Sequence, residues 1–125
     1  MTTARWSDED LRLIDAAEEL QIAVRRTDGS LRRWVPIWVV CAGAQAYVRT
    51  WYRRDTGWFG QALSAQRARI RVPGLEADVT IEDIGDASAQ VTADVNDAYR
   101  TKYGGGAGSM VSATAVATTL RLNPE

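Results

Sequence analysis

Residues 31–50 read LRRWVPIWVVCAGAQAYVRT, and this stretch decides the class of fold. From Trp34 to Val39, aliphatic residues alternate with tryptophan and proline, which is the two-residue period of a strand. Both faces of this strand, expected over 31–40, are apolar, so we expect it to be central or covered at an interface. Pro36 has no N–H to donate, which predicts a bulge or an unpaired amide at that position.

A hairpin is expected on the N-terminal side of this strand. Residues 20–25 alternate between apolar and polar, and Asp28-Gly29 after them is a strong signal for a two-residue turn. Such a turn would place Arg25 opposite Arg32, and like charges that face each other destabilise a sheet. Two interpretations stay open: a bound phosphate or carboxylate lies between these guanidinium groups, or both groups point into water.

On the C-terminal side, residues 44–50 are expected to form a further strand. A polar and aromatic loop over 51–57 and a short helix over 58–64 follow. Around the turn pair Pro73-Gly74, the sequence predicts a second hairpin. Its register would place Arg69 opposite Asp78, and Arg71 opposite Glu76, on an exposed face of paired charges.

The remaining segments complete one expected domain over residues 1–125, with residues 1–7 as a flexible N-terminus. Ser7 and Asp86 are the expected N-caps of its two longer helices. The pattern predicts a helix over 8–18, a second over 87–102, a flexible connection over 104–109 and a last strand over 115–122.

Histidine is absent, and Cys41 is the only cysteine. These two facts exclude Ser-His-Asp and Cys-His catalysis, an internal disulfide, and metal sites built from imidazole or several thiolates. We therefore expect no metal site. No apolar run approaches the roughly 18 residues of a membrane span. Acidic residues 8–10 stand where a signal peptide would be basic and then apolar, so we expect a cytoplasmic protein.

Charge is distributed unevenly along the chain. Residues 20–71 hold ten arginines and two acids, net +8, within a chain of net charge −1. This distribution predicts a local site for an anion, and it makes bulk binding of nucleic acid unexpected. Four tryptophans lie in the same basic third and are candidates for a cofactor pocket, a dimer interface or the core: Trp34, Trp38, Trp51 and Trp58.

The strongest candidate site is the run Arg49-Thr50-Trp51-Tyr52-Arg53-Arg54, which leads to the helix expected from Trp58. A strand end, a loop rich in donors and a helix N-terminus together favour anions. Hydroxyl and aromatic side chains in the same run suit a phosphorylated aromatic cofactor. They also suit stacked bases of single-stranded nucleic acid, or a polar loop whose tryptophan packs in the core.

The order of these elements resembles a known superfamily. Arg33-Trp34-Val35-Pro36-Ile37-Trp38-Val39-Val40 follows an Asp-Gly hairpin, and Gln45-Ala46-Tyr47-Val48-Arg49-Thr50 and Gly57-Trp58-Phe59 come next. Over residues 10–123 this is similar to the split-barrel flavin-binding superfamily, nearest to small bacterial proteins allied to the deazaflavin-dependent nitroreductases. Those relatives have a Gly-rich phosphate loop that this chain lacks, and a tyrosine where it has Phe59.

The resemblance implies a mainly β (α+β) fold, a six-stranded split β-barrel with two or three flanking helices. It implies a homodimer that binds FMN or a deazaflavin between its subunits, and activity as a cofactor-dependent oxidoreductase. The alternative is a non-catalytic module for an anionic metabolite or a protein partner. From the resemblance and the run above, the candidate cofactor-binding residues are Arg33, Arg49, Thr50, Trp51, Arg53, Arg54 and Trp58.

Overall fold

The chain forms seven strands and five helices along residues 5–50 and 57–125, the residues that this computed structural model describes. The strands are β1 (Leu20–Val24), β2 (Val35–Ile37), β3 (Val40–Ala42), β4 (Gln45–Val48), β5 (Arg67–Val72), β6 (Leu75–Asp83) and β7 (Leu120–Pro124). The helices are α1 (Asp8–Ala16), α2 (Gly57–Ala65), α3 (Ala89–Tyr103), the 3-10 helix η1 (Gly104–Met110) and α4 (Ala113–Val116). All strand pairs are antiparallel, in the order β2-β1-β5-β6-β7-β4-β3.

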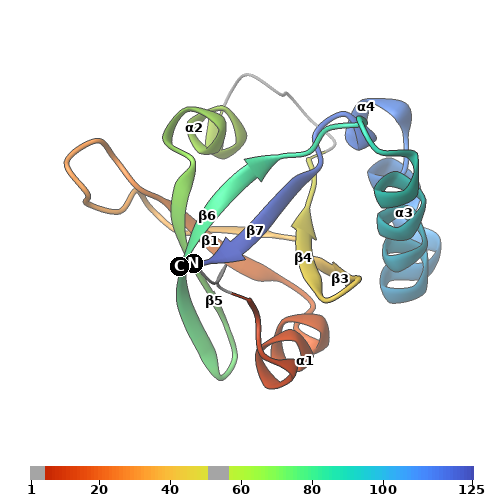
Figure 1. Ribbon diagram of the computed structural model, residues 1–125, viewed down its shortest axis with the longest axis horizontal. Helices are drawn as coiled ribbons and strands as arrows, with labels where there is room; N and C mark the ends of the chain where they lie inside the picture. Colours follow the sequence, from red (N-terminus) through yellow and green to blue (C-terminus); the bar gives the residue numbers. More distant parts are fainter. Residues whose placement is uncertain (1–4, 51–56) are drawn as a thin grey trace.

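The two outermost strands of this curled sheet are neighbours in the chain, because only Trp38 and Val39 separate β2 from β3 (Figure 1). One segment therefore pairs with β1 in its first half and with β4 in its second. The single strand expected over 31–40 is thus two short strands, and the described sheet has seven strands where six were predicted.

Side chains of α3 account for this break. The Val39 N–H donates to the Tyr103 hydroxyl at 3.2 Å, and the Val39 carbonyl accepts from Lys102 Nζ at 2.8 Å. These bonds replace ladder partners at Val39, so its backbone groups are satisfied while the pairing passes from β1 to β4.

The two hairpins differ in how well their register was predicted. Arg69 lies opposite Asp78, and Arg71 opposite Glu76, as predicted. In the first hairpin Arg25 lies opposite Leu31, so the predicted Arg25–Arg32 pair is wrong. Its turn closes with the Gly29 N–H donating to the Arg26 carbonyl, and Gly29 has φ +88, which makes the loop one residue longer than the two-residue turn expected.

The C-terminal third differs most from expectation. The expected flexible connection over 104–109 is η1, with Ala107 buried, and the strand expected over 115–122 is α4 followed by β7. The Thr118 and Thr119 hydroxyls donate to the carbonyls of Ala115 and Val116, which satisfies the end of α4. With α4, the described helices also outnumber the two or three predicted, and Ser88, not Asp86, caps α3.

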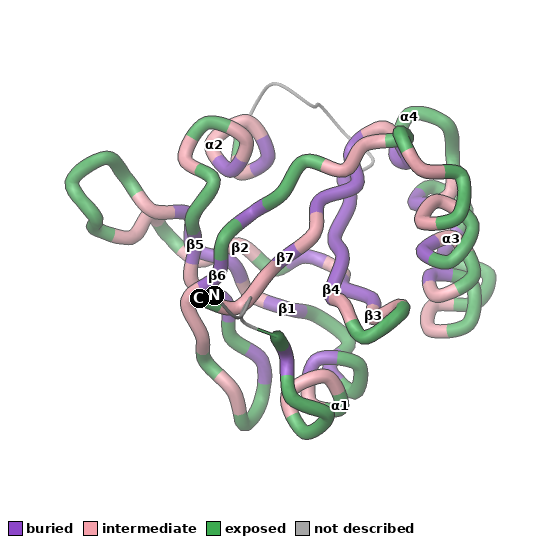
Figure 2. Tube along the Cα trace, in the orientation of Figure 1, coloured by how far each residue is buried: buried purple, intermediate pink, exposed green. Residues whose placement is uncertain are grey.

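Two apolar clusters hold these elements together. The larger fills the curled sheet under α1 and α2, and the smaller lies between α3, η1 and the strands β3 and β4. Figure 2 shows buried residues along β4 and on the side of α3 that faces it. Trp6 is also buried, and its indole N–H donates to the Leu122 carbonyl at 2.9 Å. Across the described ranges, no helix is both long and apolar enough to cross a membrane.

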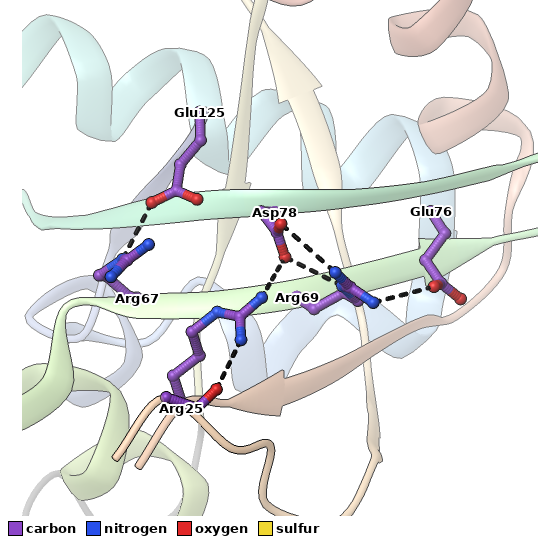
Figure 3. A network of polar contacts seen from close by, with 7 residues as sticks. Arg25, Arg67, Arg69, Glu76, Asp78 and Glu125 are labelled. Atoms are coloured by element: carbon purple, nitrogen blue, oxygen red, sulfur yellow. Dashed lines mark hydrogen bonds and ion pairs between the residues drawn. The ribbon is translucent and has the colours of Figure 1, made fainter. Parts of the chain in front are cut away.

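A network of ion pairs covers the outer face of β1, β5 and β6 (Figure 3). Asp78 accepts from Arg69 Nε at 2.9 Å and from Arg25 Nη2 at 2.6 Å. Arg69 also pairs with Glu76 at 3.5 Å, and Arg67 with Glu125 at 2.9 Å. The hydrogen bonds from Arg69 and then Arg25 lower the pKa of Asp78 to about 2.

Replacing Asp78 by asparagine is expected to lower the free energy of unfolding near pH 7 by about 1 kcal/mol, since the pairs are partly solvated. The pKa of Asp78 is lower in the folded chain than its usual 3.8. Its contribution is therefore complete above about pH 4 and is lost as the pH falls towards about 2. Urea denaturation of both proteins near pH 7 and near pH 3 measures this difference.

The control for this prediction is Asp97→Asn, because Asp97 is exposed and its one ion pair within the described residues is with Arg100, one turn along α3, at 3.6 Å. It should change stability by less than about 0.5 kcal/mol at either pH. A stability loss for Asp78→Asn that stays constant from neutral to acid pH would show that its charge is not the cause.

Candidate functional site

A cavity of about 340 Å³ opens where the ends of several elements meet. Cavities of this size, upward of about 300 Å³, are typical of sites for small molecules. Its walls come from β2, the ends of β4 and η1, the first turn of α2 and the segments beside them: Glu19, Pro36, Ile37, Trp38, Arg49, Thr50, Trp58, Ser109 and Met110.

Arg49 is the most unusual residue of this wall, because its side chain is charged and only 1% exposed. Its Nε donates to Thr119 Oγ1 at 2.8 Å, and its Nη1 donates to Asn96 Oδ1 at 2.6 Å and to the Met110 carbonyl at 2.9 Å. The guanidinium group also lies over the Tyr99 ring, 5.5 Å from its centroid. These contacts fix Arg49 between β4, α3 and the C-terminal third.

The charge of Arg49 is nevertheless not balanced. Within the described residues no carboxylate pairs with it, and its Nη2 is buried without a hydrogen-bond partner. Burial lowers the pKa of Arg49, although an arginine stays protonated at neutral pH. A buried cation with an unused N–H group is costly unless an anion reaches it. The cavity wall therefore has unmet capacity for an anion.

Two tryptophans supply the apolar part of the wall. Trp38 stacks on Tyr103, with ring centroids 4.0 Å apart and planes 4° apart, and Trp58 meets Phe59 edge-on at 5.6 Å. Burial raises the pKa of Tyr103 to about 12, so its hydroxyl keeps its proton and donates to the Glu18 carbonyl at 2.7 Å. The Tyr103 contacts hold Trp38 in place, which prepares a flat apolar surface before any ligand arrives.

Thr50 is held through its backbone. Its N–H donates to Thr118 Oγ1 at 3.0 Å, across 68 residues of sequence. Thr118 follows α4, so this bond ties the end of β4 to the C-terminal third. The preceding residue, Arg49, makes a similar link through its bond to Thr119. The end of β4 is thus a rigid part of the wall.

The structure brings some of the predicted site residues together. Arg49, Thr50 and Trp58 line this one cavity. Arg33 is exposed on the first hairpin and does not line it. The remaining predictions, Trp51, Arg53 and Arg54, lie outside the described residues.

Sequence reasoning missed several parts of the wall. Ser109 lies within the segment 104–109, which was predicted to be a flexible connection, and Met110 follows it, whereas η1 carries both residues to the cavity. Trp38 was one of four candidate tryptophans, and nothing in its local pattern distinguished it from Trp34, which instead lies under Arg71 at 4.1 Å. The stacking partner of Trp38 is 65 residues away along the chain, so local signals do not reveal it.

Solved structures of low sequence identity share the fold of this chain. HutZ, the heme storage protein from Vibrio cholerae, has a TM-score of 0.65 at 12% identity, covering 97% of this chain and 91% of that one. A FAD-binding protein from Mesorhizobium loti has a TM-score of 0.62 at 14% identity, covering 100% and 94%. An F420 reductase has a TM-score of 0.56 at 15% identity, covering 91% of each chain.

Within this class of fold, the sequence itself defines a narrower group. The chain belongs to the family described as "Uncharacterized protein conserved in bacteria (DUF2255)", which matches residues 10–122. No curated protein matches the sequence.

Proposed function

We propose that this protein binds a flavin-type cofactor, a flavin or a deazaflavin, in the cavity at the end of β4. The observation that carries the proposal is Arg49, a buried cation on the cavity wall whose Nη2 has no hydrogen-bond partner and which forms no ion pair with any described carboxylate. Such a group fits an anionic part of a ligand.

The rest of the wall suits the same class of ligand. Flavins and deazaflavins combine a flat ring system with anionic groups, and Trp38 and Trp58 offer flat apolar surfaces beside Arg49. The bound cofactor would supply hydride transfer. The chain would bind and orient it, and its aromatic wall would exclude water from the ring.

The proposal includes a homodimer and an oxidoreductase activity. In the superfamily that this chain resembles, two subunits form the cofactor sites at their interface. The described cavity is open to solvent in one subunit, and a second subunit would cover it. A FAD-binding protein and an F420 reductase among the solved structures of this fold support a flavin-type ligand.

Heme is the weaker candidate. A heme storage protein shares the fold, but this chain has no histidine, the residue that most often binds heme iron. A flavin-type cofactor held by the arginine and the tryptophans of the wall would need no histidine.

Titration with FMN, FAD and F420 tests the proposal. Wild-type protein is expected to bind at least one of them saturably, with a rise in melting temperature and a change in cofactor fluorescence. Trp58→Leu should weaken this binding by about tenfold, the equivalent of about 1.4 kcal/mol, because it removes aromatic contact area. Reduction of the bound cofactor by a substrate would then separate an oxidoreductase from a non-catalytic binding module.

The matched control is Trp34→Leu. Trp34 directly precedes β2, is half-buried and does not line the cavity. Its replacement should leave the dissociation constant unchanged within about twofold. The proposal is wrong if none of the three cofactors binds, or if both tryptophan variants weaken binding equally.

A further inference from the structure

A second and larger cavity, of about 600 Å³, is lined by the hairpin that follows β1, by the helix α2 and by the start of β5. Figure 1 shows where this hairpin and α2 lie in the fold. It shares none of its described lining residues with the cavity at the end of β4. Arg25, Arg26 and Arg32 line it from the hairpin, and Arg67 from the start of β5. None of its described lining residues is acidic.

Two of these arginines are neutralised from outside the cavity. Arg25 donates to Asp78 at 2.6 Å and to the Gly29 carbonyl at 2.7 Å, and Arg67 donates through Nε to Glu125 at 2.9 Å (Figure 3). Their acidic partners do not line the cavity, so the described groups that face it are basic or neutral.

The other two arginines form no salt bridge with any described residue. The Arg26 guanidinium donates to the Leu31 carbonyl at 2.8 Å and to Ser30 Oγ at 3.4 Å, and Asp28 on the same hairpin attracts it electrostatically. The Arg32 guanidinium makes neither an ion pair nor a hydrogen bond, and its Nε is buried. The Nε of Arg25 is buried without a partner as well. Buried N–H groups without acceptors are rare in folded proteins, and here two of them lie beside one basic cavity.

We propose that this cavity is a separate binding site for a small molecule with two or more phosphate groups. Arginine suits phosphate because its planar N–H groups pair with two oxygens at once. Gln61 and Ser64 on α2 add neutral hydrogen-bonding groups to the same wall. The site goes beyond the proposed cofactor function, because its walls are different residues.

The size and setting of the cavity favour a compact polyanion. Its volume lies within the range of about 300–1,000 Å³ that small-molecule sites occupy. The chain as a whole carries a net charge of −1, so its attraction for an anion is local to this region.

Calorimetric titration with inorganic pyrophosphate tests this site. Salt at about 0.1 M screens long-range electrostatic attraction but leaves short-range contacts in place. Wild-type protein is expected to bind saturably with one site per chain. Arg32→Gln should weaken binding by at least about tenfold, since it removes a charge that no described residue neutralises. The fold should survive, because the Arg32 side chain makes no described hydrogen bond or ion pair.

The matched control is Arg33→Gln. Arg33 is the next residue along the chain, is exposed and lines neither cavity, so the net charge changes equally while the proposed site stays intact. Pyrophosphate affinity should then stay within about twofold of wild type. Equal losses in both arginine variants would mean general charge attraction and would overturn the proposal, as would the absence of saturable binding.

A third variant distinguishes this site from the cofactor cavity. Trp58→Leu should leave pyrophosphate binding unchanged, and saturating pyrophosphate should not displace a bound flavin-type cofactor. If pyrophosphate competes with the cofactor, the two cavities act as one site and the claim of a separate site is wrong. If pyrophosphate binds while no cofactor does, this proposal stands and the cofactor proposal fails.

Discussion

Arg49→Met is expected to lower the free energy of unfolding by about 2–4 kcal/mol and to abolish binding of a flavin-type cofactor. Methionine retains the apolar stem of the side chain. It leaves Thr119 Oγ1, Asn96 Oδ1 and the Met110 carbonyl without the donors that Arg49 supplies. Removing a buried charge also removes its desolvation cost. The expected loss of stability is therefore smaller than three acceptors without donors would cause by themselves. Urea denaturation and cofactor titration measure the two effects.

Arg49→Lys is the informative partner of this variant. Lysine keeps the positive charge but loses the planar set of donors, so it should recover part of the binding and less of the stability. Asn96→Ala removes a single partner of Arg49 and should cost about 1 kcal/mol. If Arg49→Met unfolds like the wild type, Arg49 does not hold β4 to α3. If it still binds the cofactor normally, the group that carries the proposed function has been misassigned.

The sequence predicted correctly the elements whose contacts join residues that are close together in the chain. Pro73-Gly74 joins two alternating strands, and the register it implies, with Arg69 opposite Asp78, is the one observed. Ser7 caps α1 by accepting from the Asp10 N–H, as its position before three acids indicated. In both places the contacts that determine the structure join residues within about ten positions of each other. The local sequence pattern therefore agrees with the structure.

Elsewhere the pattern was ambiguous. The two-residue spacing of Val116, Thr118, Leu120 and Leu122 is that of a strand, yet α4 occupies the first residues of the segment 115–122. Ser112 Oγ accepts from the Ala115 N–H at 3.3 Å and caps this short helix, and the threonine hydroxyls close its end. Side-chain bonds to the local backbone decided against the strand, and alternation alone does not show them.

In the candidate site, too, local sequence signals predicted some features and not others. Arg49, Thr50 and Trp58 were selected for their chemistry, and they do line one cavity. Their sequence did not reveal that Arg49 is anchored by residues 47 to 70 positions away along the chain. The capacity of Arg49 for an anion depends on which of its donors those distant partners leave unused, and only the folded chain determines this.

Trp38→Ala is expected to cost about 2–3 kcal/mol of folding free energy and to weaken cofactor binding by about tenfold or more. The indole ring stacks on Tyr103, with ring centroids 4.0 Å apart. It lines both the cavity at the end of β4 and a neighbouring cavity of about 450 Å³ beside Asp15 and Lys102. Alanine would remove the shared wall, so water would gain access to the cofactor ring from the side of α3. Thermal denaturation and cofactor titration of the same preparations measure both losses.

Trp38→Phe separates the two roles of this residue. A phenyl ring can still stack on Tyr103, so the variant should recover most of the stability, whereas the smaller ring covers less of the opening between the cavities. Cofactor affinity should therefore fall between those of the wild type and Trp38→Ala. Gly106 lies against the same indole, where an added Cβ would meet it at 3.5 Å. Should Trp38→Ala bind the cofactor as tightly as the wild type, the ligand does not use this wall, and the cavity at the end of β4 is not its site.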